Sequence, residues 1–168
     1  MKKFLVGLLV ALVIVYAGLA LVGIEPQDRR PGTLIQGIEA PLPQDVSFVD
    51  PVPEVTLETQ PWYGIPLSVT VVAVSHAGHI YVPSLYDAPM PFPGTKYWNQ
   101  VVQSNPNVRL RVEGNIYPLQ IAPVTDDAEF KAVFAALGNK FPFWREQIEL
   151  KGTTPRFALL RLSPRETD

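Results

Sequence analysis

Two arginines on one predicted strand are the residues whose types and spacing most directly suggest binding chemistry. Arg109 and Arg111 alternate with the apolar Val108, Leu110 and Val112, so both arginines project from the same face of the strand. A pair of guanidinium groups on one face can bind a phosphate group. Arginines in this pattern also form solvated faces whose ion pairs contribute little, and both interpretations stay open at this point.

Two histidines flank a predicted turn and are the next candidates for chemistry. His76 and His79 could bind a metal ion, but such a site needs a third ligand, for which Asp87 is the one further candidate, and we predict no metal site. Ser75 directly precedes His76, and adjacent strand residues point to opposite faces, which argues against a nucleophilic Ser–His pair. His76 is expected to be a hydrogen-bond donor beside a cofactor, or a turn residue without chemistry.

The composition excludes several classes of function. The chain has 168 residues, with 14 Lys+Arg, 16 Asp+Glu and no cysteine, and its formal net charge is -2. This balance excludes a generally basic protein that coats nucleic acid, so we expect no nucleic-acid partner. The absence of cysteine excludes disulfides, thiolate metal sites, iron–sulfur clusters and a cysteine nucleophile. Any redox chemistry must therefore come from a bound cofactor.

The N-terminal segment predicts a membrane anchor. Residues 4–24 carry no charge and, as a helix, would span about 30 Å, the thickness of the hydrocarbon core of a bilayer. We predict an uncleaved anchor over residues 1–24; a cleaved signal peptide ending near Gly18-Leu19-Ala20 is the alternative. Lys2 and Lys3 favour a cytoplasmic N-terminus, which would put the soluble domain outside the cytoplasm.

The remaining residues divide into a connector and one domain. Residues 25–46 hold four prolines and two glycines, which predicts a proline-rich connector, and residues 47–168 form the soluble domain. Predicted strands cover residues 55–59, 67–75, 79–82, 108–112, 116–124 and 157–162. We expect residues 55–59 to form a half-buried edge strand and residues 67–75 a strand buried on both faces. Pro118 and Pro123 predict that the strand 116–124 is an edge or bulged strand.

Turn and helix signals connect these strands. Hairpin turns are predicted at Ala77-Gly78 and Gly114-Asn115, and a proline-rich loop at residues 87–94. One helix is predicted from a Thr95 cap to Ser104, and it stops at Asn105-Pro106. A second helix begins at an Asp126 cap with Glu129 at capping-box spacing and ends at Gly138-Asn139. Its apolar stripe consists of Phe130, Val133, Phe134 and Leu137.

Aromatic residues are frequent near the predicted loops. The residues concerned are Trp62, Tyr63, Phe141, Phe143 and Trp144. They could line a pocket, lie at a membrane interface or pack the core, and packing is the default expectation. Because strands and helices do not alternate, the order of elements predicts a mainly antiparallel β-barrel with peripheral helices and not a doubly wound parallel sheet.

The order of features over residues 67–137 resembles the FMN-binding split barrel, the fold of pyridoxamine 5'-phosphate oxidase and of the deazaflavin-dependent nitroreductase-like proteins. The matching stretches are LSVTVVAVS, the turn HAG, HIYVPS, KYWNQVVQSNPNVRLRV, the GN turn and YPLQIAPVTDDAEF. The earlier stretches PGTLIQG to SFVD and LETQPWYGIPLSVTV are similar to membrane-anchored bacterial members of unassigned activity. The expected fold class is thus mainly β, a split β-barrel with peripheral helices behind one N-terminal transmembrane helix.

The resemblance implies a cofactor site and a location. Lys96, Tyr97 and Trp98 match the loop-to-helix entry that lies beside the cofactor in the superfamily, so Lys96 could attract phosphate and the rings could cover an isoalloxazine. Trp98 filling the end of the barrel, with Lys96 solvated, is the alternative. The residues expected to bind FMN or a deazaflavin are Ser75, His76, Lys96, Tyr97, Trp98, Arg109 and Arg111. The resemblance also implies a homodimer in the bacterial inner membrane, where a quinone or another small molecule could be the redox partner.

One stretch departs from the pattern of the superfamily. Deazaflavin-dependent relatives usually carry a basic, glycine-containing segment just before the buried strand, whereas residues 59–66 of this chain contain no Arg or Lys. Two functions are therefore expected as alternatives. The first is a membrane-anchored flavin- or deazaflavin-binding oxidoreductase-like protein, and the second is a non-enzymatic extracytoplasmic binding or structural module that has lost the cofactor.

Overall fold

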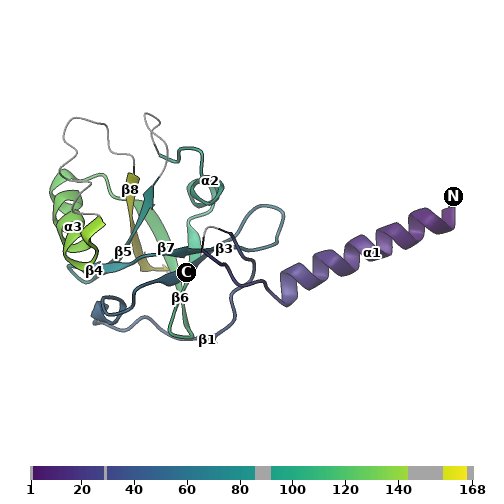
Figure 1. Cartoon of the computed structure of the whole chain (residues 1–168), viewed down its shortest axis with the longest axis horizontal. Coiled ribbons are helices and arrows are strands. Elements are labelled where there is room, and N and C mark those ends of the chain that lie inside the picture. The colour runs from purple at the N-terminus through teal and green to yellow at the C-terminus, as the bar shows by residue number, and fades with distance from the viewer. Residues whose placement is uncertain (1, 29, 86–91, 144–156, 166–168) are drawn as a thin grey trace.

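The computed structural model describes residues 2–28, 30–85, 92–143 and 157–165. Its N-terminal helix α1 (Lys2–Leu21) extends away from the β-rich part of the chain (Figure 1). None of the residues of α1 is buried, and the helix is long and apolar enough to cross a membrane. Residues 87–91 of the predicted loop 87–94, among them Asp87, and Trp144 lie outside the described residues.

The β-rich part is one curved sheet. Its strands are β1 (Ile38–Glu39), β2 (Val55–Thr59), β3 (Leu67–Val71), β4 (Val74–His76), β5 (His79–Leu85), β6 (Asn107–Val112), β7 (Asn115–Pro123) and β8 (Phe157–Pro164). They follow the order β3-β2-β6-β7-β8-β5-β4 with antiparallel neighbours, and β1 pairs with β7 in parallel. The prediction of a mainly antiparallel sheet is confirmed.

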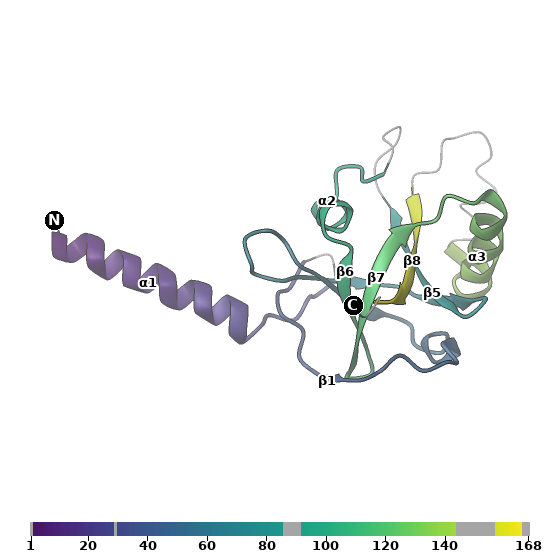
Figure 2. The same cartoon turned by 180° about the vertical axis from the view of Figure 1, so that it is seen from behind.

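The two ends of the sheet meet, because the strands at its two ends follow each other in the chain. Only Val72 and Ala73 separate β3 from β4. Two residues span less than about 11 Å, so the start of β4, at one end of the strand order, must lie close to the end of β3, at the other. The sheet is thereby curled into a barrel, as both views show (Figures 1 and 2).

The predicted burial of the strands 67–75 and 55–59 was wrong, because burial depends on which segments cover the outside of the barrel. The strand 67–75 is interrupted at Val72 and Ala73, and most of β3 is only half-buried. Strands β5 and β8 are nearly continuously buried, because a helix packs on their outer face. The strand 55–59 is not at an edge: β2 lies between β3 and β6, and all five of its residues are buried.

Strand β7 is also internal, contrary to the prediction from its prolines. Pro118 is tolerated because it falls between two pairing regions: β1 pairs with residues 115–116 of β7, whereas β8 pairs with residues 119–123. The hairpin before it turns at Glu113-Gly114, one residue earlier than predicted, and both turn residues have positive φ (48° and 86°).

The two shorter helices lie where the sequence predicts them, with different ends. Helix α2 (Tyr97–Ser104) is capped by Lys96, so the predicted Thr95 cap is wrong, whereas its stop at Asn105 is confirmed. Helix α3 (Asp127–Lys140) begins as predicted, because Asp126 accepts a hydrogen bond from the Glu129 backbone N–H (2.7 Å). It runs to Lys140, one residue past the predicted Gly138-Asn139 end, and the Lys140 side chain makes tertiary hydrogen bonds there.

The core has two parts. The main cluster fills the barrel and includes Leu57, Leu110 and Leu160, each with no exposed surface. The second lies between α3 and the outer face of β5 and β8, where the predicted stripe of α3 packs and the Phe134 and Phe157 rings stack at 4.8 Å. Helix α3 thus covers the side of the barrel that lies away from α1 (Figure 2).

A polar cluster borders this second core. The Tyr81 hydroxyl donates to Glu129 Oε1 at 2.7 Å, and Arg161 Nη1 lies 3.2 Å from the same oxygen. Burial, followed by the hydrogen bond to Glu129, raises the pKa of Tyr81 to about 12. The phenol therefore stays neutral at physiological pH and acts as a donor that fixes α3 on the sheet.

The Lys140 ammonium joins three segments at the closing point of the barrel. Its Nζ donates to the backbone carbonyls of Val49 (2.9 Å), Val52 (2.7 Å) and Ala73 (2.7 Å). These carbonyls belong to the 3-10 helix η1 (Ser47–Val49), to the turn after it and to the bend between β3 and β4. Helix α3 is therefore bonded directly to the bend through which the two ends of the sheet meet.

Candidate functional site

The outer face of β2 and β6 gathers the polar side chains that the sequence singles out. Val108, Leu110 and Val112 point into the core with at most 2% exposure, so Arg109 and Arg111 project outward. The register of the sheet places Glu58 opposite Arg109 and Thr56 opposite Arg111. The prediction that the two arginines share a face is thus correct, and each has a polar neighbour on the adjacent strand.

Arg109 pairs with a buried carboxylate. Its Nη1 lies 2.8 Å from Glu58 Oε1, and the Glu58 side chain is only 4% exposed against 27% for Arg109. The second oxygen of Glu58 accepts a hydrogen bond from the Ile35 backbone N–H at 2.7 Å. Glu58 therefore connects β6 to the proline-rich segment 25–46, which packs onto this face and is more than a passive linker.

Arg111 forms an ion pair with Glu25, which belongs to the same proline-rich segment 25–46. Its Nη1 and Nη2 donate to the two oxygens of Glu25 at 2.6 and 2.5 Å, and further bonds reach the Gln36 carbonyl and Thr56 Oγ1. The hydrogen bonds from Arg111 lower the pKa of Glu25, against a smaller opposing effect of burial. This bidentate pair occupies the position where Arg111 would meet a phosphate group.

This pair predicts a small, pH-dependent effect of Arg111→Met. Because the pKa of Glu25 in the folded state lies below its ordinary value of 4.5, the pair stabilises the fold above that pH and the stabilisation is lost as pH falls through the lowered pKa. Glu25 is 52% exposed, so we expect a loss of at most about 1 kcal/mol at pH 7. Urea unfolding at pH 7 and pH 3 measures this; a loss at pH 3 equal to that at pH 7 would contradict the assignment.

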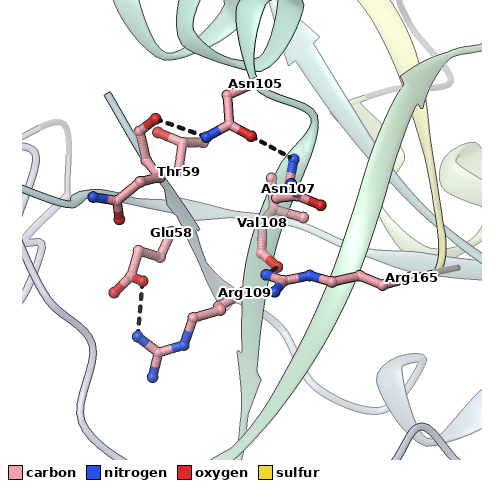
Figure 3. A pocket seen from close by; sticks show the side chains of 8 residues that line it. Glu58, Thr59, Asn105, Asn107, Val108, Arg109 and Arg165 are labelled. Atoms are coloured by element: carbon pink, nitrogen blue, oxygen red, sulfur yellow. Dashed lines mark hydrogen bonds and ion pairs between the residues drawn. The ribbon is translucent and has the colours of Figure 1, made fainter. Parts of the chain in front are cut away.

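A cavity of about 320 Å³ lies beside Arg109 (Figure 3). It is lined by Glu58, Thr59, Gln60, Asn105, Asn107, Val108, Arg109 and Arg165. Seven of these eight residues are polar or charged, and two arginines against one glutamate leave an excess positive charge. Such a lining suits a small ligand that carries a carboxylate or phosphate group.

Backbone and amide contacts hold the walls of this cavity in place. Arg165 Nη2 donates to the Val108 carbonyl (2.9 Å), and its Nε donates to the Leu119 carbonyl (3.3 Å). Figure 3 shows Arg165 beside Val108. Asn105 Nδ2 donates to the Gln60 carbonyl at 3.2 Å. A guanidinium has five N–H donors, so Arg109 and Arg165 retain capacity for a ligand after these contacts.

The predicted aromatic entry at α2 is divided between core and surface. Trp98 is 7% exposed and belongs to the barrel core, which matches the alternative that it fills the end of the barrel. Tyr97 is 44% exposed and lies beside Tyr63, whose pKa is raised by burial and by a hydrogen bond with Tyr97. Lys96 caps α2, and none of these three residues lines the cavity.

Ser75 and His76 also lie apart from the cavity. Both backbone N–H and hydroxyl of Ser75 donate to the Asp50 carboxylate, at 2.7 and 2.5 Å. His76 pairs with His79 across the β4–β5 hairpin, where both rings face the Tyr81 ring at 6.4 Å. Within the described part of the chain there is no cluster of three or more His, Cys, Asp or Glu that could hold a metal ion. Of the seven residues assigned to a cofactor, only Arg109 lines the cavity.

Several residues of the site carry no sequence signal. Glu58 occupies an alternating position of an ordinary-looking strand, and Arg165 follows the last predicted strand. Outside the cavity lining, Asn99 carries no signal either: it is fully buried in α2, where it accepts from Ser84 Oγ (2.9 Å) and donates to the Pro93 carbonyl (2.8 Å). The available pointers to the cavity were Arg109 and the Asn105-Pro106 helix stop, which marks where α2 passes into β6.

Comparison with solved structures identifies the architecture. A pyridoxamine 5'-phosphate oxidase-like protein from Listeria innocua matches 72% of this chain and 90% of its own at 12% identity and a TM-score of 0.50. The fold of the chain is a split β-barrel. HutZ, a heme storage protein from Vibrio cholerae, matches 71% of this chain and 87% of its own at 18% identity and a TM-score of 0.53. An F420-H2 dependent reductase matches 77% of this chain and 100% of its own at 14% identity and a TM-score of 0.51.

Similarity in sequence does not extend the comparison. No protein-family model and no curated protein matches the chain. The matched split barrels differ in the ligand that their names give, F420-H2 in one and heme in another. The fold is therefore shared among proteins with different ligands, and the ligand of this chain must be argued from its own residues.

Proposed function

We propose that the chain is a membrane-anchored split-barrel protein that binds a small anionic ligand in the cavity where β2 ends and β6 begins. The observation that carries this proposal is the lining: two arginines, one already partnered glutamate, and amide and hydroxyl groups from Thr59, Gln60, Asn105 and Asn107. The excess positive charge favours a ligand with a carboxylate or phosphate group.

The anchor is proposed from helix α1. Its 20 residues correspond to about 30 Å of helix, enough to cross the hydrocarbon core, and none of them is buried against the barrel. Lys2 and Lys3 favour a cytoplasmic N-terminus, so the barrel would lie on the opposite side of the membrane. The homodimer remains a prediction from the resemblance, and the quinone partner remains a prediction from the membrane location alone.

Binding of a flavin or deazaflavin is the second candidate, favoured by the fold shared with an F420-H2 dependent reductase. The cavity itself does not fit an isoalloxazine ring. Val108 is its single apolar lining residue, whereas flat cofactor rings are held between apolar and aromatic side chains. The observed side chains thus fit the anionic part of a ligand better than a cofactor ring, and we favour the binding module over the oxidoreductase.

Calorimetric titration of the full chain in detergent micelles tests the proposal, first with inorganic phosphate and then with FMN. We expect saturable phosphate binding that Arg165→Met weakens at least ten-fold, equivalent to about 1.4 kcal/mol. The matched control Arg111→Met removes an arginine from the same polar face but not from the cavity, and should change the affinity less than two-fold. Phosphate binding that survives Arg165→Met would contradict the placement of the site, and FMN binding at much higher affinity than phosphate would favour the second candidate.

A further inference from the structure

The loop between β2 and β3 exposes aromatic side chains on the α1 side of the barrel. Trp62 is 92% exposed, and no described large apolar side chain is more exposed. Its ring meets the Tyr63 ring edge-on at 5.7 Å, and Tyr63 in turn lies beside the exposed Tyr97. We call Trp62, Tyr63 and Tyr97 the aromatic patch. Single exposed apolar residues are ordinary, but a cluster of rings from this loop and the start of α2 marks an interaction surface.

This loop is bonded directly to the membrane-spanning candidate. The Tyr16 hydroxyl of α1 donates to the Tyr63 carbonyl at 2.9 Å. Gly64 has φ +80°, which favours glycine, and a Cβ there would lie 2.9 Å from the same hydroxyl, so a larger residue would displace this contact. Figures 1 and 2 both show the loop leading into β3 reaching toward α1.

The position of Tyr16 along α1 sets the depth of the contact. Tyr16 precedes the end of the helix at Leu21 by five residues, or about 7.5 Å of helix. If the 20 residues of α1 fill the hydrocarbon core, this level lies about 7.5 Å inside its edge, just below the interface where tyrosine and tryptophan are enriched. Whatever contacts Tyr16 from outside the helix must then share that depth.

We infer that the aromatic patch docks on the phospholipid bilayer that α1 crosses, with Trp62 at the edge of the acyl-chain region. This inference rests on the proposed anchor. Residues 59–66 carry no charged side chain, so the loop can enter the interface without desolvating an ion. The absence of Arg and Lys from residues 59–66, which distinguishes this chain from the deazaflavin-dependent proteins, thus suits the loop to the membrane interface. Gln60, which lines the cavity, begins the same loop, so docking places the cavity beside the membrane surface.

Fluorescence quenching of the full chain in phosphatidylcholine vesicles tests the inference. The Trp62 signal is the difference between the wild-type emission and that of Trp62→Phe, which removes the contributions of Trp98 and Trp144. We expect brominated phosphatidylcholine to quench at least half of this difference signal. Acrylamide in the water should quench it several-fold less than it quenches free tryptophan.

Two results would overturn the inference, and they can be told apart. If acrylamide quenches the Trp62 signal as fully as free tryptophan while brominated lipid has no effect, the loop is in water and the docking is wrong. If the chain also fails to float with vesicles in a density gradient, the anchor itself is wrong. Neither result bears on phosphate binding in the cavity, which is measured in detergent without a bilayer.

Discussion

Replacing Lys140 with methionine is expected to destabilise the fold by about 3 kcal/mol, since each of the three hydrogen bonds from the ammonium to a carbonyl is charge-assisted and contributes about 1.5–3 kcal/mol. The cost of burying the charge offsets part of their sum, and that burial lowers the pKa of Lys140 against a smaller opposite effect of Asp50. Methionine keeps the length of the stem but leaves the three carbonyls without this donor. Val49 and Ala73 are fully buried, so water cannot easily replace it.

Urea unfolding in detergent micelles measures this effect. The matched control is Lys131→Met on the exposed face of α3, for which we expect a change within about 0.5 kcal/mol. Amide exchange in β4 should also accelerate in Lys140→Met, because the bend that joins β3 to β4 loses its bond to α3. Equal urea midpoints for the two variants would show that Lys140 does not fasten the closing point of the barrel.

The second large effect is expected for Arg109→Met, at about 3 kcal/mol, because it leaves the nearly buried Glu58 carboxylate without its ion-pair partner. Arg111→Met instead leaves the Glu25 carboxylate without its partner. About half of the Glu25 side chain is already exposed to water, so this variant is expected to lose several-fold less stability. Two arginines on the same face of one strand therefore differ in energetic importance because their partners differ in burial.

A double-mutant cycle separates the ion pair from other effects of the substitution. Adding Glu58→Gln to Arg109→Met removes the unpaired charge, so the double variant should recover at least about 1 kcal/mol relative to Arg109→Met alone. Glutamine can still accept the hydrogen bond from the Ile35 backbone N–H, which keeps the connector in place. A double variant less stable than Arg109→Met would show that the pair is not what holds Glu58.

The sequence predicts the elements of this fold well and the covering of its faces poorly. Alternation in residues 108–112 and the Asp126 cap are local patterns, and both are confirmed. Burial on the outside of the sheet depends on distant segments instead. The strand β2 reads as half-buried because it alternates, yet residues 25–40 cover its polar face through contacts such as that of Ile35 with Glu58. Proline-rich segments give no periodic signal from which such packing can be predicted.

The candidate site was predicted in part for the same reason. The shared face of Arg109 and Arg111 follows from their spacing, but their different partners do not, because Glu58 and Glu25 lie 51 and 86 residues away in sequence. The sequence around Trp98 is compatible with a ring beside a cofactor and with a ring in the core. The structure puts the ring in the core. Only the three-dimensional register brings Arg165 to the cavity.

The central claim is that an anionic ligand binds between Arg109 and Arg165. The most direct measurement follows the arginine Nε–Hε signals of the ¹⁵N-labelled full chain in micelles during titration with inorganic phosphate. We predict that the Arg109 and Arg165 signals shift along one common saturation curve while the Arg111 signal, held by Glu25, stays in place. Signals that do not move, or that all drift linearly with phosphate concentration, would contradict the claim.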